Sequence, residues 1–233
     1  MNDSIVRKIT NSPRRKSLYH FTRIRNLPSI AHLDALYSSN GADSSLSDGR
    51  RITRREIEFH GHTFTANAHL RISELMMDPH TTLHQFYHYL DQHVFLWPTQ
   101  RDCLKMLEMY ARREPDEAFA VFQLDAYSLI HDFYDTVKVS KYDSGSSPRY
   151  PNRCSYRKSL RMFLPVDKFE IIRESDIPTK PSEIREVLVE DKVTNLSRYL
   201  QAIFCKDVSD ITGSWAKYAH SFIDFTNCVK LDR

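Results

Sequence analysis

Residues 17–30 of the chain read Ser-Leu-Tyr-His-Phe-Thr-Arg-Ile-Arg-Asn-Leu-Pro-Ser-Ile. Alternation along a strand places His20 and Thr22 on one face and the neighbouring aromatic residues on the other. Asn26 follows in a predicted tight turn, and Pro28 suits the first turn of a helix because its missing N–H would be unpaired there. The stretch therefore predicts a strand, a turn and a helix that hold a polar pair beside a helix N-terminus, a setting that suits an anionic or amide-bearing ligand.

The composition bounds the class of protein. The chain has 233 residues, of which 41% are hydrophobic and 12% aromatic, enough for one domain with an appendage. A formal net charge of +3 is too small to indicate a nucleic-acid partner by itself, and the 5 glycines form no phosphate-binding loop pattern. The 4 cysteines are far apart, which favours reduced thiols over a zinc site or a disulfide framework. No stretch resembles a signal peptide or a membrane span, so we expect a cytoplasmic protein with no membrane partner.

Apolar runs and their breakers predict the other elements. Strands are expected at 93–98, 118–124, 137–139 and 160–164, with a helix that starts at Thr99 and ends before Pro115. Further along, Ser182 is a candidate helix cap, and apolar residues from Leu196 to Phe204 recur at helical spacing. We expect a basic N-terminal arm over 1–16, a domain over 17–173, and a C-terminal helical extension over 174–233 that packs on the domain.

Two groups of basic residues leave alternatives open. His80, His84 and His88 recur every four residues, so a helix would present them on one face, but no carboxylate has the placement of a H-E-x-x-H site. We therefore expect a polar helix face and no metal, with zinc as the alternative because three more histidines lie nearby in the sequence. The arginines at positions 50, 51, 54 and 55 suit either a solvated rim or an edge that contacts phosphates.

A long irregular loop is predicted over 141–157. Arginine alternates there with tyrosine, a composition typical of surfaces that bind single-stranded nucleic acid through phosphate contacts and base stacking. The plain alternative is an ordinary loop with packed tyrosines. On the first interpretation the substrate-binding candidates are Arg149, Tyr150, Arg153 and Arg157.

The opening motif, Y-H-F-T-x-I-x-N-L-P-S-I, resembles the start of the DarT-like ADP-ribosyltransferases, which consume NAD, modify nucleic-acid bases and are often toxins. The resemblance covers about residues 17–172 and implies an α+β, ADP-ribosyltransferase-like split β-sheet core with NAD between two small sheets. It implies that His20, Phe21, Thr22, Asn26 and Trp97 bind the co-substrate NAD. It also implies that Arg71 steadies the NAD phosphates, with Arg54 or Arg55 as the competing candidate.

One position departs from the family pattern. DarT-like enzymes carry a glutamate just before a Phe-Leu pair, and that position is Met162 here. Either Asp143 replaces this carboxylate, or an arginine does part of its work, or transfer activity is lost. The leading hypothesis is an NAD-dependent ADP-ribosyltransferase that modifies a base in single-stranded RNA or DNA, as the toxin of a toxin–antitoxin or phage-defence system with an antitoxin protein as partner. The alternatives are a protein-directed transferase, a non-catalytic module that binds NAD or nucleic acid, and a metal-dependent nuclease.

Overall fold

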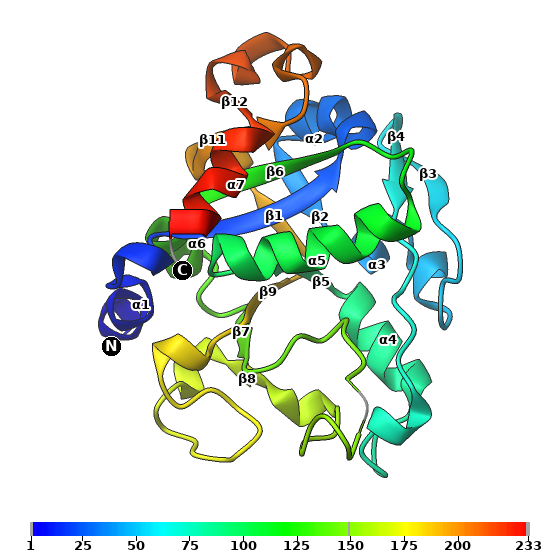
Figure 1. Cartoon of the computed structure of the whole chain (residues 1–233), viewed down its shortest axis with the longest axis vertical. Helices are drawn as coiled ribbons and strands as arrows, with labels where there is room; N and C mark the ends of the chain where they lie inside the picture. Colours follow the sequence, from blue (N-terminus) through cyan, green and yellow to red (C-terminus); the bar gives the residue numbers. More distant parts are fainter. Residues whose placement is uncertain (1, 149, 232–233) are drawn as a thin grey trace. The chain divides into compact units, whose positions relative to one another are not determined.

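The computed structural model describes residues 2–148 and 150–231, and for residues 228–231 it describes the backbone alone. The chain forms two compact units, each assembled from separate stretches of sequence (Figure 1). Unit 1 comprises the described residues of 1–36, 96–133 and 194–233, and unit 2 comprises those of 37–95 and 134–193. Each unit holds its own four-stranded sheet. The predicted α+β class, with the strands split between two sheets, is confirmed.

Unit 1 is built on a mixed sheet with the strand order β1-β6-β11-β12. β1 and β11 both pair antiparallel with β6, and β12 joins β11 in parallel. The register places His20 opposite Phe122 and Thr22 opposite Ala120. The bounds are β1 Ser17–Arg23, β6 Phe119–Asp125, β11 Leu200–Cys205 and β12 Ala219–Ser221.

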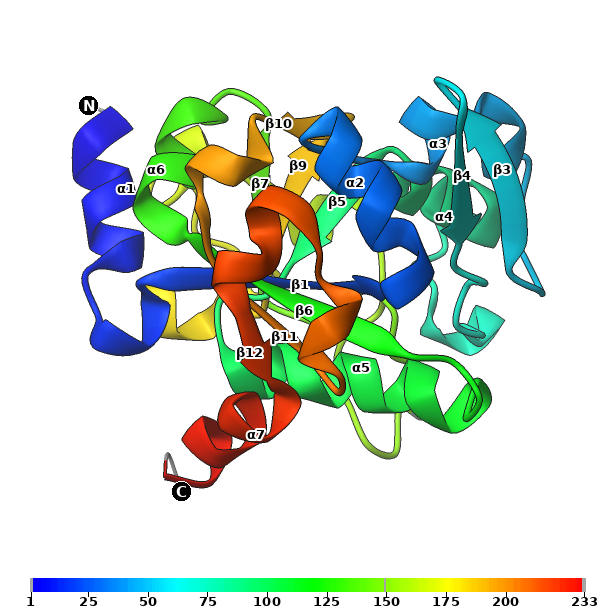
Figure 2. The same cartoon turned by 90° about the horizontal axis from the view of Figure 1, so that it is seen from above.

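The helices of unit 1 surround this sheet. α5 and α7 contact each other, and they contact β1 and β11 respectively, while α1 packs on α6 (Figures 1 and 2). α5 starts as predicted, because Thr99 Oγ1 accepts the Asp102 N–H at 3.1 Å. The α-helices are α1 Asn2–Thr10, α2 Leu27–Leu33, α5 Gln100–Arg113, α6 Ala126–Asp132 and α7 Phe222–Leu231. The 3₁₀ turns are η1 Pro13–Arg15, η2 Ile24–Asn26, η8 Leu196–Arg198, η9 Val208–Asp210 and η10 Gly213–Tyr218.

Unit 2 is built on a second sheet, with the order β5-β9-β7-β8, in which β7 is antiparallel to both neighbours. Its strands are β5 His93–Leu96, β9 Glu186–Glu190, β7 Val137–Ser140 and β8 Phe163–Pro165. A separate hairpin joins β3 Arg55–Phe59 to β4 His62–Ala66. The helices are α3 Ser39–Ala42 and α4 Leu83–Asp91, and the 3₁₀ turns are η3 Ser44–Ser47, η4 Glu74–Met76, η5 Leu160–Met162, η6 Val166–Lys168 and η7 Pro181–Glu183. A separate pair of short strands joins β2 Ala35–Tyr37 to β10 Lys192–Thr194.

The predicted helical stripe near the C-terminus is wrong. Residues 200–205 form β11, an inner strand of the unit 1 sheet, and all but Gln201 are buried. A strand covered on both faces carries a continuous apolar run, and a short run of that kind also satisfies helical spacing. Ser182 does not cap a helix either, because it lies inside the short turn η7.

The two ends of the chain also differ from expectation. Residues 174–233 were expected to pack on a finished domain, but they supply β9 to the middle of the unit 2 sheet and β11 to the middle of the unit 1 sheet. The described part of the expected N-terminal arm contains helix α1, whose Val6 and Ile9 are buried. Two apolar residues three positions apart on one helix face were enough to anchor it.

Candidate active site

The strand β1 separates polar from aromatic side chains as the sequence predicts. His20 is half-buried and stacks on its cross-strand neighbour Phe122, with ring centroids 6.2 Å apart. On the opposite face, Phe21 stacks on Trp97 at 5.1 Å and tilts against Tyr110 of α5 at 5.5 Å. The His20 and Thr22 face is therefore distinct from the packed aromatic face.

Asn26 joins this polar face through the turn η2. Its Nδ2–H donates to Thr22 Oγ1 at 3.3 Å, and both residues are buried. Pro28 lies in the first turn of α2, as predicted. α2 has only 7 residues, so the helix dipole adds little, and the amide–hydroxyl pair supplies the polar character. We call His20, Thr22 and Asn26 the β1 corner.

A buried ion pair fixes the end of β1. Arg23 is 1% exposed, and its Nη2 contacts Glu114 Oε1 at 2.9 Å and Oε2 at 2.6 Å. Its Nε lies 3.4 Å from Glu117 Oε2, an oxygen that Arg25 also contacts at 3.1 Å. These contacts tie the strand that carries the β1 corner to the segment between α5 and β6. Sequence reasoning missed this role, because the two glutamates lie about ninety positions away from Arg23.

Trp97 and Phe21 lie apart from the β1 corner. The Trp97 backbone exchanges two hydrogen bonds with Tyr19, at 2.8 and 2.9 Å, and its ring is 6% exposed. Of the five residues predicted to bind NAD, the structure thus gathers His20, Thr22 and Asn26 on one face of β1. It places Phe21 and Trp97 in the packing on the other face, since successive side chains of a strand point to opposite sides.

The remaining predicted site residues belong to unit 2. Arg71 is exposed, in the segment before η4, and Arg153 is exposed in the 150–157 part of the predicted loop. The Arg157 guanidinium lies over the Tyr150 ring, 4.6 Å from its centroid. Arg149 lies outside the described residues. This is a cation–π contact within the loop, and the predicted contacts of these residues with nucleic acid stay a prediction.

The three described tyrosines of this loop, Tyr142, Tyr150 and Tyr156, are all partly buried against the hydrophobic cluster of unit 2. Tyr142 and Tyr156 stack on each other with ring centroids 3.6 Å apart and an interplanar angle of 8°. Both are half-buried. The plain interpretation, packed tyrosines, therefore holds for this pair.

Asp143 begins a tight turn. Its Oδ1 accepts N–H groups from Gly145 and Ser146, both at 3.0 Å. An aspartate that caps the amides two and three residues ahead fixes the turn locally. The side chain is half-buried, so the carboxylate is partly accessible to solvent.

The structure places a second carboxyl group beside this turn. Glu186 of β9 is 1% exposed, and its Oε2 accepts the Ser144 N–H at 3.1 Å. Among the described residues, its Oε1 has no hydrogen-bond partner. Lys158 is 0% exposed and donates to the carbonyl oxygens of Asp143 and Ser144, at 2.7 and 2.6 Å. We call Asp143, Lys158 and Glu186 the charged cluster.

Burial shifts the proton equilibria of this cluster. It raises the pKa of Glu186, with the nearby Asp143 charge acting in the same direction. Burial also lowers the pKa of Lys158, against the opposing effect of the two carboxylates. A buried acid with a raised pKa is a common feature of catalytic sites.

Sequence reasoning missed Glu186, because no local signal marks it. Glu186 follows Arg185 in the stretch Ile-Arg-Glu-Val-Leu-Val over 184–189, and charged residues beside a short apolar run are usually exposed. The position expected to hold the glutamate, Met162, is 1% exposed and packs in a hydrophobic cluster with Phe86 and Leu188.

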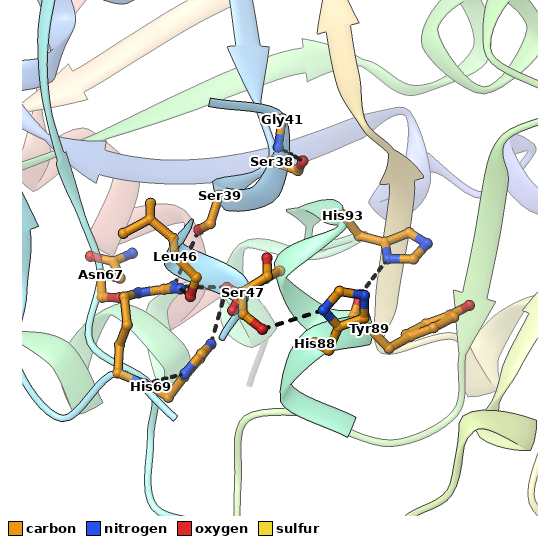
Figure 3. A network of polar contacts seen from close by, with 12 residues as sticks. Ser38, Ser39, Gly41, Leu46, Ser47, Asn67, His69, His88, Tyr89 and His93 are labelled. Atoms are coloured by element: carbon orange, nitrogen blue, oxygen red, sulfur yellow. Dashed lines mark hydrogen bonds and ion pairs between the residues drawn. The ribbon is translucent and has the colours of Figure 1, made fainter. Parts of the chain in front are cut away.

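Arg51 and His88 have partners within unit 2, and Figure 3 shows the polar contacts around His88, His69 and His93. The arginines at 50, 54 and 55 are exposed. Arg51 was expected at a solvated rim or a phosphate-contacting edge, but it is buried, and its Nη2 contacts Asp91 Oδ1 at 2.8 Å. Asp91 Oδ1 also lies 3.1 Å from His69 Nε2. His69 Nδ1 accepts the Arg51 backbone N–H at 2.9 Å, so Nε2 carries the proton.

The predicted histidine row is incomplete. The helix α4 contains His84 and His88, while His80 precedes it. His88 Nδ1 lies 3.3 Å from the Ser47 carbonyl oxygen (Figure 3). Within residues 2–148 and 150–231, the structure shows no group of three or more metal-binding side chains. The same residues include no helix long and apolar enough to span a membrane.

His93 forms a further polar contact in unit 2. Its Nδ1 donates to the Tyr89 carbonyl oxygen at 2.7 Å (Figure 3), and its Nε2 accepts from Lys138 Nζ at 3.0 Å. Burial lowers the pKa of His93 to about 4, and the Lys138 charge acts in the same direction. His93 is therefore neutral in the folded protein at pH 7.

Comparison with known proteins gives one family match. The family of unknown function DUF7002 matches residues 16–200. The chain belongs to the DUF7002 family. The match covers the β1 corner and the charged cluster of this DUF7002 protein, as well as the central strand β9, and it ends at the first residue of β11. No curated protein matches its sequence.

Solved structures with some similarity to the DUF7002 chain are those of DarT from Thermus sp. 2.9. The complex with NAD+ is 14% identical, covers 85% of each chain, and has a TM-score of 0.40. The complex with carba-NAD+ is 12% identical, with 94% of this chain and 91% of that chain covered and a TM-score of 0.40. The complex with ADP-ribosylated ssDNA is 13% identical, with 83% and 82% covered and a TM-score of 0.37.

Proposed function

We propose that this protein is an NAD-dependent ADP-ribosyltransferase that modifies a base in single-stranded nucleic acid. The observation that carries the proposal is the β1 corner. The motif that resembles the DarT-like transferases folds so that His20, Thr22 and Asn26 share one face of β1, and Asn26 bonds to Thr22. The proposal does not depend on the distant structural similarities, although the ligands named for them are NAD+ and ADP-ribosylated ssDNA.

The β1 corner suits the nicotinamide end of NAD. A carboxamide needs both a donor and an acceptor, and the Thr22 hydroxyl, the Asn26 amide and the His20 imidazole each supply them. The buried Arg23 contacts hold this strand end rigid. A rigid polar corner fixes the sugar and the carboxamide before the reaction, so little ordering entropy is lost on the way to the transition state.

The reaction is a substitution at the anomeric carbon of the nicotinamide ribose. The bond from C1′ to the nicotinamide nitrogen breaks with its electron pair, and neutral nicotinamide leaves. A base nitrogen gives its electron pair to C1′ and then loses a proton to a carboxylate. A carboxylate also stabilises the positive charge that develops on the ribose.

Glu186 is the carboxyl group that we assign to this role, with Asp143 as the second candidate. Glu186 is buried, its Oε1 has no partner among the described residues, and its pKa is raised by burial. Burial raises the pKa of Glu186 to about 8, so its ionised form is a stronger base than an ordinary carboxylate. Arg71 remains the candidate for the NAD phosphates.

Single-stranded nucleic acid is the proposed acceptor, because a base within a duplex is not accessible to an enclosed site. Tyr150, Arg153 and Arg157 are the described residues of the proposed strand-binding surface. Both RNA and DNA fit this chemistry. Modification of cytoplasmic nucleic acid would harm the host cell, so we propose a toxin that is kept in check by an antitoxin protein.

The test uses purified protein with labelled NAD and, separately, an RNA pool, a single-stranded DNA pool and a protein lysate. We expect label on one nucleic acid with wild type and with His131→Ala, an exposed histidine of α6, and none with His20→Ala. If His20→Ala labels nucleic acid as well as wild type does, the assignment of the β1 corner to the active site is wrong. Label on protein alone would identify a protein-directed transferase, and NAD binding without any label would favour a binding module.

A further inference from the structure

We propose that Lys158 is a positioning residue that holds the Asp143–Ser144 peptide and, through it, the Glu186 carboxyl group in one arrangement. The Asp143 carbonyl oxygen accepts from Lys158 Nζ at 2.7 Å, and the Ser144 N–H donates to Glu186 Oε2 at 3.1 Å. These two groups belong to the same peptide unit. Lys158 and Glu186 therefore hold opposite ends of one peptide plane, and the Ser144 carbonyl adds a third contact at 2.6 Å.

Stability alone does not explain a lysine at this position. Lys158 is 0% exposed, and two of its three donors bond to backbone carbonyl oxygens. The cost of moving an ammonium group out of water is several times larger than the gain from ordinary hydrogen bonds, and apolar replacements at buried charges are often neutral or stabilising. A methionine would fill the same space at lower cost. The charge and the donors of Lys158 therefore have a function beyond packing.

The surroundings show what Lys158 acts on. The titratable groups that influence Lys158 are Asp143, Glu186 and Cys154, and those that influence Glu186 are Asp143 and Lys158. Asp143 disfavours the ionised form of Glu186, whereas the Lys158 charge favours it. The Lys158 charge thus opposes the effect of burial and limits the rise in the pKa of Glu186, while the Lys158 hydrogen bonds fix the turn.

A catalytic role for Lys158 rests on the proposed function, because that function assigns Glu186 as the base. The hydrogen bonds and the titration of Glu186 can be tested without any transfer reaction. We would record the Glu186 side-chain titration by carbon NMR, with Glu186→Gln to assign the signal, and the amide hydrogen exchange of Ser144. The variants are Lys158→Met, which removes charge and donors, and Lys158→Gln, which keeps two donors. Lys141→Met is the control, because the Lys141 Nζ bonds to the Ser175 carbonyl oxygen, which is not part of the 143–144 peptide.

We expect Lys158→Met to move the Glu186 titration upward by about one pH unit and to speed Ser144 exchange about tenfold or more. Lys158→Gln should move the titration equally and speed the exchange less, and Lys141→Met should change neither. If Lys158→Met does not fold, the shift of the Glu186 titration in Lys158→Gln tests the proposal instead. An unchanged titration in a folded variant would overturn the proposal.

Transfer activity then separates this inference from the proposed function. If wild type transfers ADP-ribose, Lys158→Met should lower kcat with little change in the KM for NAD, and its rate should rise at a higher pH than that of wild type. If wild type transfers nothing while the NMR shifts appear, the positioning role stands and the proposed function fails.

Discussion

The β1 corner of unit 1 and the charged cluster of unit 2 differ in how their residues come together. The β1 corner comes from seven consecutive positions, and within it Asn26 bonds to Thr22. The charged cluster draws Asp143, Lys158 and Glu186 from three segments, and two of its three side chains are charged groups removed from water. A local motif can hold neutral polar groups at small cost, whereas buried charges need partners that distant segments supply.

The largest expected effect is on the transfer rate of Glu186→Gln, a variant that tests whether Glu186 of the charged cluster acts in the reaction or only in packing. Glu186→Gln keeps an oxygen that can accept the Ser144 N–H but removes the ionisable group. We expect transfer to fall by about 10²- to 10⁴-fold, the range for loss of a general base, with little change in the free energy of unfolding. Single-turnover rates and urea unfolding measure the two quantities. If Glu186→Gln transfers at the wild-type rate, Asp143 becomes the candidate base. Asp143→Asn is the matched variant that tests Asp143.

The second prediction concerns the stability that the buried Arg23 ion pairs give to the strand that carries the β1 corner. Arg23→Met removes the buried partner of Glu114 and Glu117 and leaves their carboxylates with less compensation. We expect the free energy of unfolding to fall by about 3 kcal/mol. Urea denaturation measures it. Arg25→Met is the control, since Arg25 is 47% exposed and its pair should contribute under about 1 kcal/mol. Similar losses of unfolding free energy in both variants would show that the burial of Arg23 does not strengthen its contribution to stability.

A pH experiment tests a buried titratable group of unit 2 that lies outside the charged cluster, His93. The pKa of His93 is about 4 in the folded protein and about 6.5 when unfolded. Between pH 6.5 and pH 4 the unfolded state binds the extra proton, so stability falls as the pH falls through this window. His93 should account for up to about 3 kcal/mol of this loss.

The measurement is urea unfolding at several pH values for wild type and His93→Gln. The variant should have a flatter slope between pH 6.5 and pH 4, whatever its absolute stability. His131→Gln, an exposed histidine, should keep the wild-type slope. Parallel slopes for wild type and His93→Gln would show that His93 is protonated in the folded state.

The smallest expected effect concerns the hydrogen bond inside the β1 corner. Thr22→Val keeps the shape and removes the hydroxyl that accepts from Asn26 Nδ2. We expect a loss of about 1 kcal/mol in the free energy of unfolding, from a single neutral hydrogen bond, and weaker NAD binding. Thermal unfolding and calorimetric titration with NAD check these two results. Thr63→Val on the β4 hairpin is the control for NAD binding, and an equal loss of affinity there would contradict the assignment of Thr22.

The sequence by itself determined the β1 corner and most of the local elements. The alternation of residues 17–23, the turn at Asn26 and Pro28 in the first turn of α2 all appear as predicted. Strands β5, β6 and β7 and the Thr99 cap of α5 also follow from local patterns. These features depend on interactions between residues a few positions apart, which periodicity and capping rules describe.

The tertiary structure alone decided which distant segments complete each sheet and where the buried charges lie. β11 was mistaken for a helix because a short apolar run satisfies both periods, and only its burial between β6 and β12 decides for a strand. Glu186 was missed because nothing local distinguishes a buried carboxyl group from an exposed one. Its partners at 144 and 158 lie about 30 to 40 positions away, and burial, which long-range packing creates, is what gives that carboxyl group its unusual chemistry.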